Sequence, residues 1–179
     1  MSSAQACFWR ALSLSATFLS LSENQPKPLL KIGGIPLIER QVKDLVKSGI
    51  KNISITNRTE EKCIFLKKKL KYLNIINWPN LKNELKNYDI IINATSLGLK
   101  NGQDFNFNFD QVKDSLIYID TIYNPLETKT FKYLKEKNIR VFNGLEMFIY
   151  QGQKAFYLWT KINPEIDQKL IELLLSKLK

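Results

Sequence analysis

Two short apolar runs constrain the fold of this chain more than any other feature of its 179 residues. Residues 89–93 read Asp-Ile-Ile-Ile-Asn, and residues 116–120 read Leu-Ile-Tyr-Ile-Asp. Neither run alternates apolar and polar positions, so each predicts a strand that is covered on both faces. Such strands belong mostly to parallel sheets that carry helices on both sides. We therefore expect an α/β fold built around a buried parallel sheet.

Amphipathic segments fill the intervals between the predicted strands. One helix is indicated by apolar residues at helical spacing before the stop signal Gly49, namely Leu37, Ile38, Val42, Leu45 and Val46. Further strands are expected at 29–32, 53–56, 75–76 and 140–142, and further helices at 60–73, 81–85, 130–137, 146–160 and 165–178. This alternation predicts a doubly wound, Rossmann-like, three-layer α/β domain over residues 23–179, with helices at its carboxyl terminus.

The net charge of +10, from 27 Lys and Arg against 17 Asp and Glu, favours an anionic ligand or partner. A phosphorylated cofactor meets that condition, but a solvated lysine-rich face such as residues 67–71 also explains the charge. No zinc-finger, RNP or basic-zipper signature accompanies it, so we expect no nucleic-acid partner. The sequence contains no histidine, which excludes histidine triads and histidine metal sites, and we expect no metal.

Residues 1–22 are rich in Ser and Ala, with one Arg and no acidic residue. This composition is typical of a transit peptide or of a poorly ordered tail, and we expect a poorly ordered leader. Polar residues interrupt its apolar run, so we do not expect it to span a membrane. Cys7 and Cys63 lack the spacing of a disulfide or metal motif, which favours a reduced, cytoplasmic protein.

The end of the second predicted strand carries Asn57-Arg58-Thr59, with Lys62 one helical turn after Arg58. In doubly wound nucleotide folds this strand end reaches the adenosine ribose, and a carboxylate there accepts a bond from the 2′-hydroxyl. Here a guanidinium stands in that place, and its paired N–H donors suit a phosphate, which indicates NADP rather than NAD. Alternatively, the segment is a surface turn that caps the next helix, because Thr59 precedes two acidic residues.

Small polar residues also follow the two apolar runs at 89–93 and 116–120. Residues 93–98, Asn-Ala-Thr-Ser-Leu-Gly, include Thr95, and residues 120–128, Asp-Thr-Ile-Tyr-Asn-Pro-Leu-Glu-Thr, include Thr121 and Tyr123. Both segments lie at carboxyl ends of predicted strands, where ligands bind in open α/β sheets. An ordinary turn explains the first segment equally, and packing beside Pro125 is the alternative for Tyr123.

A third segment, residues 143–151, reads Asn-Gly-Leu-Glu-Met-Phe-Ile-Tyr-Gln. Gly144 lacks a Cβ and so permits close approach of a ligand to the backbone. Gln151 lies one helical turn after Met147, and its amide both donates to and accepts from hydroxyl groups. The alternative is an amphipathic helix with Met147, Phe148 and Phe156 in the core, and we expect Phe148 and Phe156 to be core residues in either case.

These four segments, in this order, resemble the NADP-binding half of shikimate dehydrogenase over residues 53–179. The resemblance implies NADPH-dependent reduction of 3-dehydroshikimate to shikimate, in the chorismate pathway to aromatic amino acids. It implies that Asn57, Arg58, Thr59 and Lys62 hold the 2′-phosphate. It further implies that Thr95, Thr121 and Gly144 line the cofactor groove, Thr121 through its backbone, and that Tyr123 and Gln151 contact the substrate.

Residues 21–56 instead resemble the early part of sugar-phosphate nucleotidyltransferases, through Pro-Lys-Pro-Leu and Gly-Gly-x-Pro-Leu stretches that include Lys27. We therefore expect a hybrid that changes family at residues 53–57. The segment Gly33-Gly34-Ile35-Pro36 would replace the glycine-rich pyrophosphate loop of the dehydrogenases. Pro36, expected in a first helical turn, would remove one backbone donor and weaken phosphate binding.

Shikimate dehydrogenases carry a separate amino-terminal domain with the catalytic Lys and Asp, and we find no counterpart of it in this sequence. The resemblance therefore implies an incomplete enzyme with very low turnover on its own, and the sequence assigns no catalytic residue. A non-catalytic nucleotide-binding module and a nucleotidyltransferase-related fragment with Mg²⁺-dependent triphosphate binding remain alternatives. The sequence does not indicate an oligomeric state.

Overall fold

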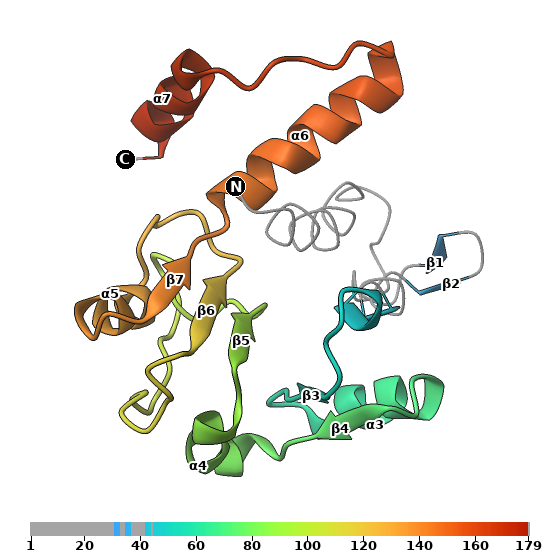
Figure 1. The fold of residues 1–179 in the computed structure, drawn as a ribbon, viewed down its shortest axis with the longest axis vertical. Coiled ribbons are helices and arrows are strands. Elements are labelled where there is room, and N and C mark those ends of the chain that lie inside the picture. The colour runs from blue at the N-terminus through green and yellow to red at the C-terminus, as the bar shows by residue number, and fades with distance from the viewer. Residues whose placement is uncertain (1–30, 33–34, 37–41, 44, 179) are drawn as a thin grey trace. The chain divides into compact units, whose positions relative to one another are not determined.

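The computed structural model describes residues 31–32, 35–36, 42–43 and 45–178 of the chain. Figure 1 traces the chain through its labelled helices and strands, with the residues outside this description in grey. Contacts within the chain divide it into two compact units. The first unit comprises Met1–Trp78 and Tyr150–Asn163, and the second comprises Pro79–Ile149 and Pro164–Lys179. The predicted poorly ordered leader, residues 1–22, and Lys27 lie outside the described residues.

In the first unit, β3 (Ile53–Ile55) and β4 (Leu73–Ile75) form a parallel pair, and α3 (Glu60–Lys69) connects them. Residues 53–55 form the predicted strand, whereas the helix ends at Lys69 rather than at residue 73. The core of this unit contains Val42, Leu70 and Leu73, with Ile53, Ile55 and Leu66 packed against them. Burial of these branched side chains holds the crossover helix on the strand pair.

The amino-terminal part of the described chain differs from the prediction. β1 (Lys31–Ile32) pairs with β2 (Ile35–Pro36) in antiparallel fashion. Pro36 therefore lies in a strand, and the expectation that it lies in a first helical turn is wrong. Among the described strands, β1 pairs with β2 and β3 pairs with β4, so the predicted strands at 29–32 and 53–56 are not paired with each other. Two short strands that are separated by two residues and pair in antiparallel fashion have the register of a hairpin, which is a different arrangement from a strand-to-helix turn. The predicted phosphate-loop residues Gly33 and Gly34 lie outside the described residues.

The predicted helix before Gly49 is present, with residues 42–43 and 45–47 helical. Gly49 has a φ of 91°, and its N–H donates to Val46 O at 3.0 Å while Ile50 N–H donates to Leu45 O at 3.2 Å. These two bonds form the glycine-dependent helix end that the sequence predicts. Val42 is buried but Val46 is exposed, so only part of the predicted apolar stripe is covered.

In the second unit, β5 (Ile90–Asn93), β6 (Ile117–Asp120) and β7 (Arg140–Phe142) form a parallel sheet in the order β5-β6-β7. Short helical turns precede it, η2 (Trp78–Asn80), α4 (Leu81–Glu84) and η3 (Leu85–Asn87). α5 (Lys129–Glu136) connects β6 to β7 and packs against both strands. Both apolar runs thus form parallel strands, and the predicted α/β class is confirmed.

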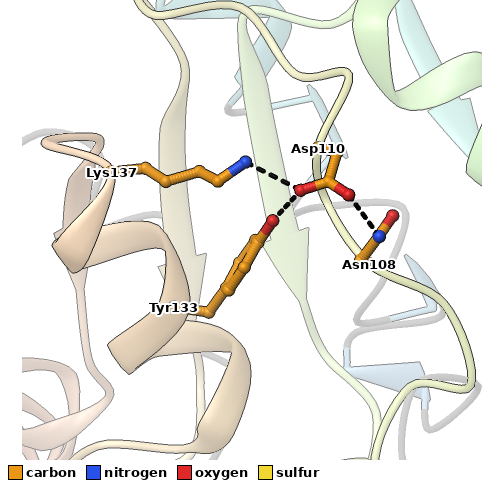
Figure 2. Close-up of polar contacts among 4 residues, drawn as sticks. All are labelled: Asn108, Asp110, Tyr133 and Lys137. Atoms are coloured by element: carbon orange, nitrogen blue, oxygen red, sulfur yellow. Dashed lines mark hydrogen bonds and ion pairs between the residues drawn. The ribbon is translucent and has the colours of Figure 1, made fainter.

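A long connection between β5 and β6 carries a cluster of three alternate aromatic residues, of which Phe109 packs against the sheet. Phe109 meets Phe105, Phe107 and Tyr118 at ring-centroid distances between 5.5 and 5.8 Å. Asp110, next in the chain, accepts hydrogen bonds from Asn108 and from Tyr133 on α5 (Figure 2). Lys137 Nζ, just after α5, lies 2.7 Å from the same carboxylate. The connection is therefore fastened to both the sheet and the helix.

Two further helices follow β7, namely α6 (Leu145–Thr160) and α7 (Gln168–Lys177), close to the predicted ranges. Met147 is buried on α6, but Phe148 and Phe156 are 39% and 43% exposed, so the expectation that both are core residues is wrong. No residue of α7 is buried, and its apolar residues Leu170 and Leu173 are exposed. Within the described part of the chain, no helix is both long and apolar enough to cross a membrane.

The core of the first unit allows a stability test. Leu73 is fully buried, and its neighbour Tyr72 is 46% exposed. We expect Leu73→Ala to lower the free energy of unfolding by about 2–5 kcal/mol, because it removes buried apolar volume and leaves a cavity. Tyr72→Ala serves as the control and should change it by less than about 1 kcal/mol. Urea denaturation followed by fluorescence measures both, and equal losses would contradict this core.

Candidate functional site

Two buried polar residues end the neighbouring strands β5 and β6. Asn93 and Asp120 are opposite each other in the parallel register and are 3% and 1% exposed. Asn93 Nδ2 donates to Asp120 Oδ1 at 3.1 Å. Because a buried polar group costs free energy unless it is hydrogen-bonded, each residue needs such partners. Their bond joins the two strands at the carboxyl edge of the sheet, where α/β folds bind ligands.

Asn93 also orders the loop that follows β5. Its Oδ1 accepts from Thr95 N–H at 3.0 Å and from the Thr95 hydroxyl at 2.7 Å, and its Nδ2 donates to Leu97 O at 3.0 Å. The Thr95 hydroxyl in turn accepts from Leu97 N–H at 3.1 Å. This is an Asn-stabilised turn, so the alternative of an ordered turn holds for residues 93–97. The predicted cofactor residue Thr95 lies at the sheet edge within it.

Asp120 orders the segment after β6 in the same way. Its carboxylate accepts from Ile122 N–H at 3.1 Å and from the hydroxyl of Thr128 at 2.8 Å, and the Tyr118 hydroxyl lies 3.4 Å from Oδ2. Burial raises the pKa of Asp120, although these hydrogen bonds favour the charged form and oppose the rise. Burial and the adjacent carboxylate raise the pKa of Tyr118, which keeps that hydroxyl protonated as a donor.

Thr121 and Gly144 bring the ends of all three strands together. Thr121 N–H and its hydroxyl both donate to Asn93 O, at 3.0 and 2.9 Å. Gly144 N–H donates to Ile122 O at 2.9 Å, and a Cβ on Gly144 would lie 2.1 Å from Thr121 O. Thus the chain's own backbone fills the space beside Gly144. This close contact is sufficient by itself to require glycine at this position.

Tyr123 follows β6 and stacks on Phe148 of α6, with ring centroids 4.5 Å apart and planes inclined by 22°. Tyr123 is half-buried. Asn143 supports the same region, because its side chain donates to Leu126 O at 3.0 Å and accepts from Leu145 N–H at 3.1 Å. Phe148 is thus a partner of a predicted substrate residue, which explains an aromatic side chain outside the core.

The four residues predicted at the 2′-phosphate lie between β3 and the first turn of α3. Asn57 Oδ1 accepts from Thr59 N–H at 2.9 Å, which forms a turn. Thr59 occupies the N-cap position, but its side chain makes no capping hydrogen bond. Arg58, Thr59 and Lys62 are exposed, and Asn57 is half-buried. Residues 57–59 therefore form the turn before the helix that the alternative interpretation predicts. The Thr59 side chain does not cap the helix, although that interpretation expects it to.

Gln151 belongs to the first unit and lies one turn after Met147 on α6; both side chains are buried. Among the described residues, two buried side-chain atoms lack a hydrogen-bond partner, Gln151 Nε2 and Thr56 Oγ1. An unpaired buried polar atom costs about 1–3 kcal/mol, which a polar ligand would offset. Thr56 follows β3 directly and precedes Asn57, the first of the predicted phosphate residues. One unpaired atom therefore lies next to a predicted ligand residue, and the other belongs to one, Gln151.

The predicted site residues fall into two groups. Thr95, Thr121, Tyr123 and Gly144 belong to the second unit, and Asn57, Arg58, Thr59, Lys62 and Gln151 belong to the first. Sequence reasoning missed the buried pair Asn93 and Asp120 as structural determinants, although a polar residue that ends an otherwise apolar strand was the available signal. Within the described residues, no cluster of three or more His, Cys, Asp or Glu is arranged to hold a metal ion.

Two glycines near α6 provide a matched pair of variants. Gly144→Ala would drive its Cβ into Thr121 O, whereas a Cβ at Gly152 would meet nothing within 4 Å. We expect Gly144→Ala to destabilise the protein by roughly 2–4 kcal/mol, because backbone must move. Gly152→Ala should stabilise it by up to about 1 kcal/mol through helix propensity. Thermal unfolding of both variants tests this, and a harmless Gly144→Ala would refute the close contact.

The buried carboxylate predicts a pH dependence. The pKa of Asp120 is raised above 3.8 in the folded protein, so the folded state binds this proton more readily than the unfolded chain. The contribution of Asp120 to the free energy of unfolding is therefore fully present below pH 3.8, the ordinary pKa of the group. It is lost as pH rises through the higher pKa of the folded protein.

Asp120→Asn removes this titration and is the control variant. The free energy of unfolding of the unmodified protein minus that of Asp120→Asn should be larger at about pH 4 than at about pH 7, because the raised pKa favours the protonated folded state. Urea titrations at several pH values measure the difference. A constant difference over this range would mean that Asp120 titrates alike in both states.

Comparisons with known proteins agree with this geometry. Residues 20–122 match the family model described as Shikimate / quinate 5-dehydrogenase, and residues 144–168 match the Shikimate 5′-dehydrogenase C-terminal domain. Shikimate dehydrogenase (NADP(+)) of Pelagibacter ubique (strain HTCC1062) is 40% identical over 163 residues, which are 91% of this chain and 59% of that protein. The chain thus spans about three-fifths of the length of this curated relative.

Two solved structures share the fold. Shikimate dehydrogenase from Aquifex aeolicus has a TM-score of 0.64 at 29% identity, over 89% of this chain and 57% of that one. A shikimate dehydrogenase in complex with NADP⁺ has a TM-score of 0.64 at 32% identity, over 82% of this chain and 53% of that one. These neighbours agree with the predicted Rossmann-like architecture.

The family match begins at residue 20 and so includes residues 21–56. The predicted resemblance of that segment to nucleotidyltransferases, and with it a change of family at residues 53–57, is not borne out. The family models match residues 20–122 and 144–168. The parallel strands that end in Asn93 and Asp120 lie within the first of these ranges. The chain belongs to the shikimate/quinate 5-dehydrogenase family.

Proposed function

We propose that this chain forms the NADP-binding part of a shikimate dehydrogenase. The proposed reaction is the NADPH-dependent reduction of 3-dehydroshikimate to shikimate, a step of chorismate and aromatic amino acid biosynthesis. The observation that carries the proposal is the convergence of three loops, with Thr95, Thr121 and Gly144, on the buried Asn93–Asp120 pair at the carboxyl edge of one sheet. The names of the relatives agree with it.

The cofactor groove in this proposal is lined by Thr95, Thr121 and Gly144. A dinucleotide binds across the carboxyl ends of parallel strands, close to backbone groups. The loops at this edge are already fixed by hydrogen bonds within the chain, including both donors of Thr121 to Asn93 O. A groove fixed before binding loses little conformational entropy when the ligand arrives, so this arrangement favours tight binding.

The 2′-phosphate is assigned to Asn57, Arg58, Thr59 and Lys62. Glu60 and Glu61 in the first turn of α3 oppose an anion there, so the formal charge of Arg58, Lys62 and these two acids sums to zero. Net charge therefore does not explain phosphate binding at this position. Directed donors do, because a guanidinium offers paired N–H groups and the amino end of a ten-residue helix carries partial positive charge.

The substrate contacts are assigned to Tyr123 and Gln151. Stacking on Phe148 restricts the Tyr123 ring and leaves its hydroxyl as the polar end. Gln151 Nε2 is a buried donor without a partner in the described chain, and a substrate hydroxyl or carboxylate would satisfy it. When bound, NADPH supplies the hydride for the carbonyl carbon. The side chains of Tyr123 and Gln151 contribute binding and orientation of the substrate.

Reduction of a carbonyl also requires a positioned proton donor. Asp120 and Tyr118 are buried, and the Asp120 carboxylate already accepts hydrogen bonds from Asn93, Ile122 and Thr128 as well as from Tyr118. We assign no catalytic acid within the described residues, and we propose that this chain alone turns over slowly. We further infer a small-molecule enzyme of the cytoplasm, without nucleic-acid or membrane partners, since Cys63 is a free thiol and no recognised nucleic-acid motif accompanies the charge.

Arg58→Ala tests the cofactor assignment. Loss of a charge-assisted contact should weaken NADP⁺ binding by roughly 10- to 100-fold, while NAD⁺, which lacks the 2′-phosphate, should bind within about twofold of the unmodified protein. Isothermal titration calorimetry with both dinucleotides measures the ratio. Arg140→Ala is the matched control, because Arg140 is exposed at the amino end of β7, away from the carboxyl edge.

Three outcomes would contradict the proposal. The unmodified chain could fail to bind either dinucleotide, it could prefer NAD⁺, or Arg140→Ala could lower NADP⁺ affinity as much as Arg58→Ala. Brisk NADPH formation from shikimate by the purified chain would contradict the narrower statement that it turns over slowly alone.

A further inference from the structure

We propose that Asn93 and Asp120 form a single positioning unit that holds residues 94–98 and residues 121–128 in the arrangement that binds the dinucleotide. The assignment to cofactor binding rests on the proposed function above. Neither side chain has surface for a ligand, since they are 3% and 1% exposed. They act through the residues that they hold, and so they are positioning residues rather than catalytic ones.

The hydrogen bonds of the pair extend to both loops. On one side, Asn93 bonds Thr95 through Oδ1 and Leu97 through Nδ2, which defines the turn after β5. On the other side, Asp120 bonds the N–H of Ile122 and the hydroxyl of Thr128. The Asn93–Asp120 bond is the side-chain link between these two sets. A disturbance at either residue should therefore reach both loops.

The second loop is held at both of its ends. Ile122 lies two residues after Asp120, and Thr128 is the N-cap of α5, where its hydroxyl also accepts from Phe131 N–H at 3.2 Å. Tyr123 lies between these anchors. Consequently the position of Tyr123, a predicted substrate residue, depends on the same carboxylate that is bonded to Asn93.

The negative charge of Asp120 is not required to hold the two loops. The polar groups that contact its carboxylate in the described chain are neutral, namely the side chains of Asn93, Tyr118 and Thr128 and the N–H of Ile122. An asparagine at position 120 keeps one oxygen for Asn93 Nδ2 and Ile122 N–H. Its amide nitrogen would then face two hydroxyl groups, which accept as well as donate. Asp120→Asn should preserve the geometry.

By the same reasoning, the reverse change, Asn93→Asp, should disrupt the hydrogen bonds. Asn93 Nδ2 donates two bonds, to Leu97 O and to Asp120 Oδ1. In Asn93→Asp an oxygen would face that carbonyl and that carboxylate, with repulsion at both. Even a protonated Asp has one hydrogen for these two acceptors. Two substitutions of nearly equal size thus have opposite predicted effects, which a role in packing alone would not produce.

The experiment compares four variants of the full chain, Asp120→Asn, Asp120→Ala, Asn93→Asp and Asn93→Ala. NADP⁺ affinity is measured by calorimetry, and amide hydrogen exchange of residues 94–98 and 121–128 is measured without ligand. Asp120→Asn should bind within about threefold of the unmodified protein, and the other three should bind roughly tenfold or more weakly. Asn93→Asp should accelerate exchange in both loops, although residue 93 directly precedes only the first.

Leu85→Ala is the control for general destabilisation, because Leu85 is buried in the second unit before the amino end of β5. At equal loss of thermal stability it should leave NADP⁺ affinity and local exchange in the two loops close to those of the unmodified protein. Equal weakening by Leu85→Ala would overturn the inference. So would exchange in Asn93→Asp that increases in residues 94–98 alone, or equal behaviour of Asn93→Asp and Asp120→Asn.

The two proposals fail separately. If the unmodified chain does not bind NADP⁺, the proposed function is refuted together with the cofactor role of the pair. Exchange in both loops that still depends on Asn93 would then support the pair only as a structural link between them. If NADP⁺ binds but no variant weakens it, the proposed function stands and the positioning unit is refuted.

Discussion

The hydrogen bond between Asn93 and Asp120 is the interaction on which the carboxyl edge of the sheet depends. It joins β5 and β6 where both strands end, and the remaining atoms of the two side chains bond the loops that follow. A buried amide facing a buried carboxylate is stable only when each donor and acceptor is used. This requirement fixes the loops as well as the pair, because the loops supply the missing partners.

Close packing of the backbone supplements this polar network. Gly144 lies so near Thr121 that a Cβ has no room, and this contact ties the segment before α6 to the end of β6. On α6, Phe148 then meets the ring of Tyr123. Away from that edge, Asp110 joins the connection between β5 and β6 to α5 (Figure 2). The second unit is thus restrained from several directions by contacts between residues distant in sequence.

The predictions that succeeded rest on strong local signals. Residues 90–92 and 117–119 form strands because uninterrupted apolar runs are stable only when covered on both faces, and Gly49 ends its helix because a positive φ favours glycine there. The prediction that Pro36 begins a helix failed because proline suits both a first helical turn and the edge of a short strand, and local sequence does not separate the two. Phe148 and Phe156 were wrongly expected in the core, since apolar character alone does not fix which helix face is covered.

By itself, the sequence determined the α/β class, most element positions and the segments that carry the candidate ligand residues, because periodicity and strand-end motifs are local properties. Only the tertiary structure decided what those residues do for one another. Asn93 and Asp120 are 27 residues apart, and their pairing arises from the parallel register of β5 and β6. The sequence likewise did not reveal the reason for glycine at position 144. The atom that leaves no room for a Cβ there is the carbonyl oxygen of Thr121, which follows β6 and is distant in sequence.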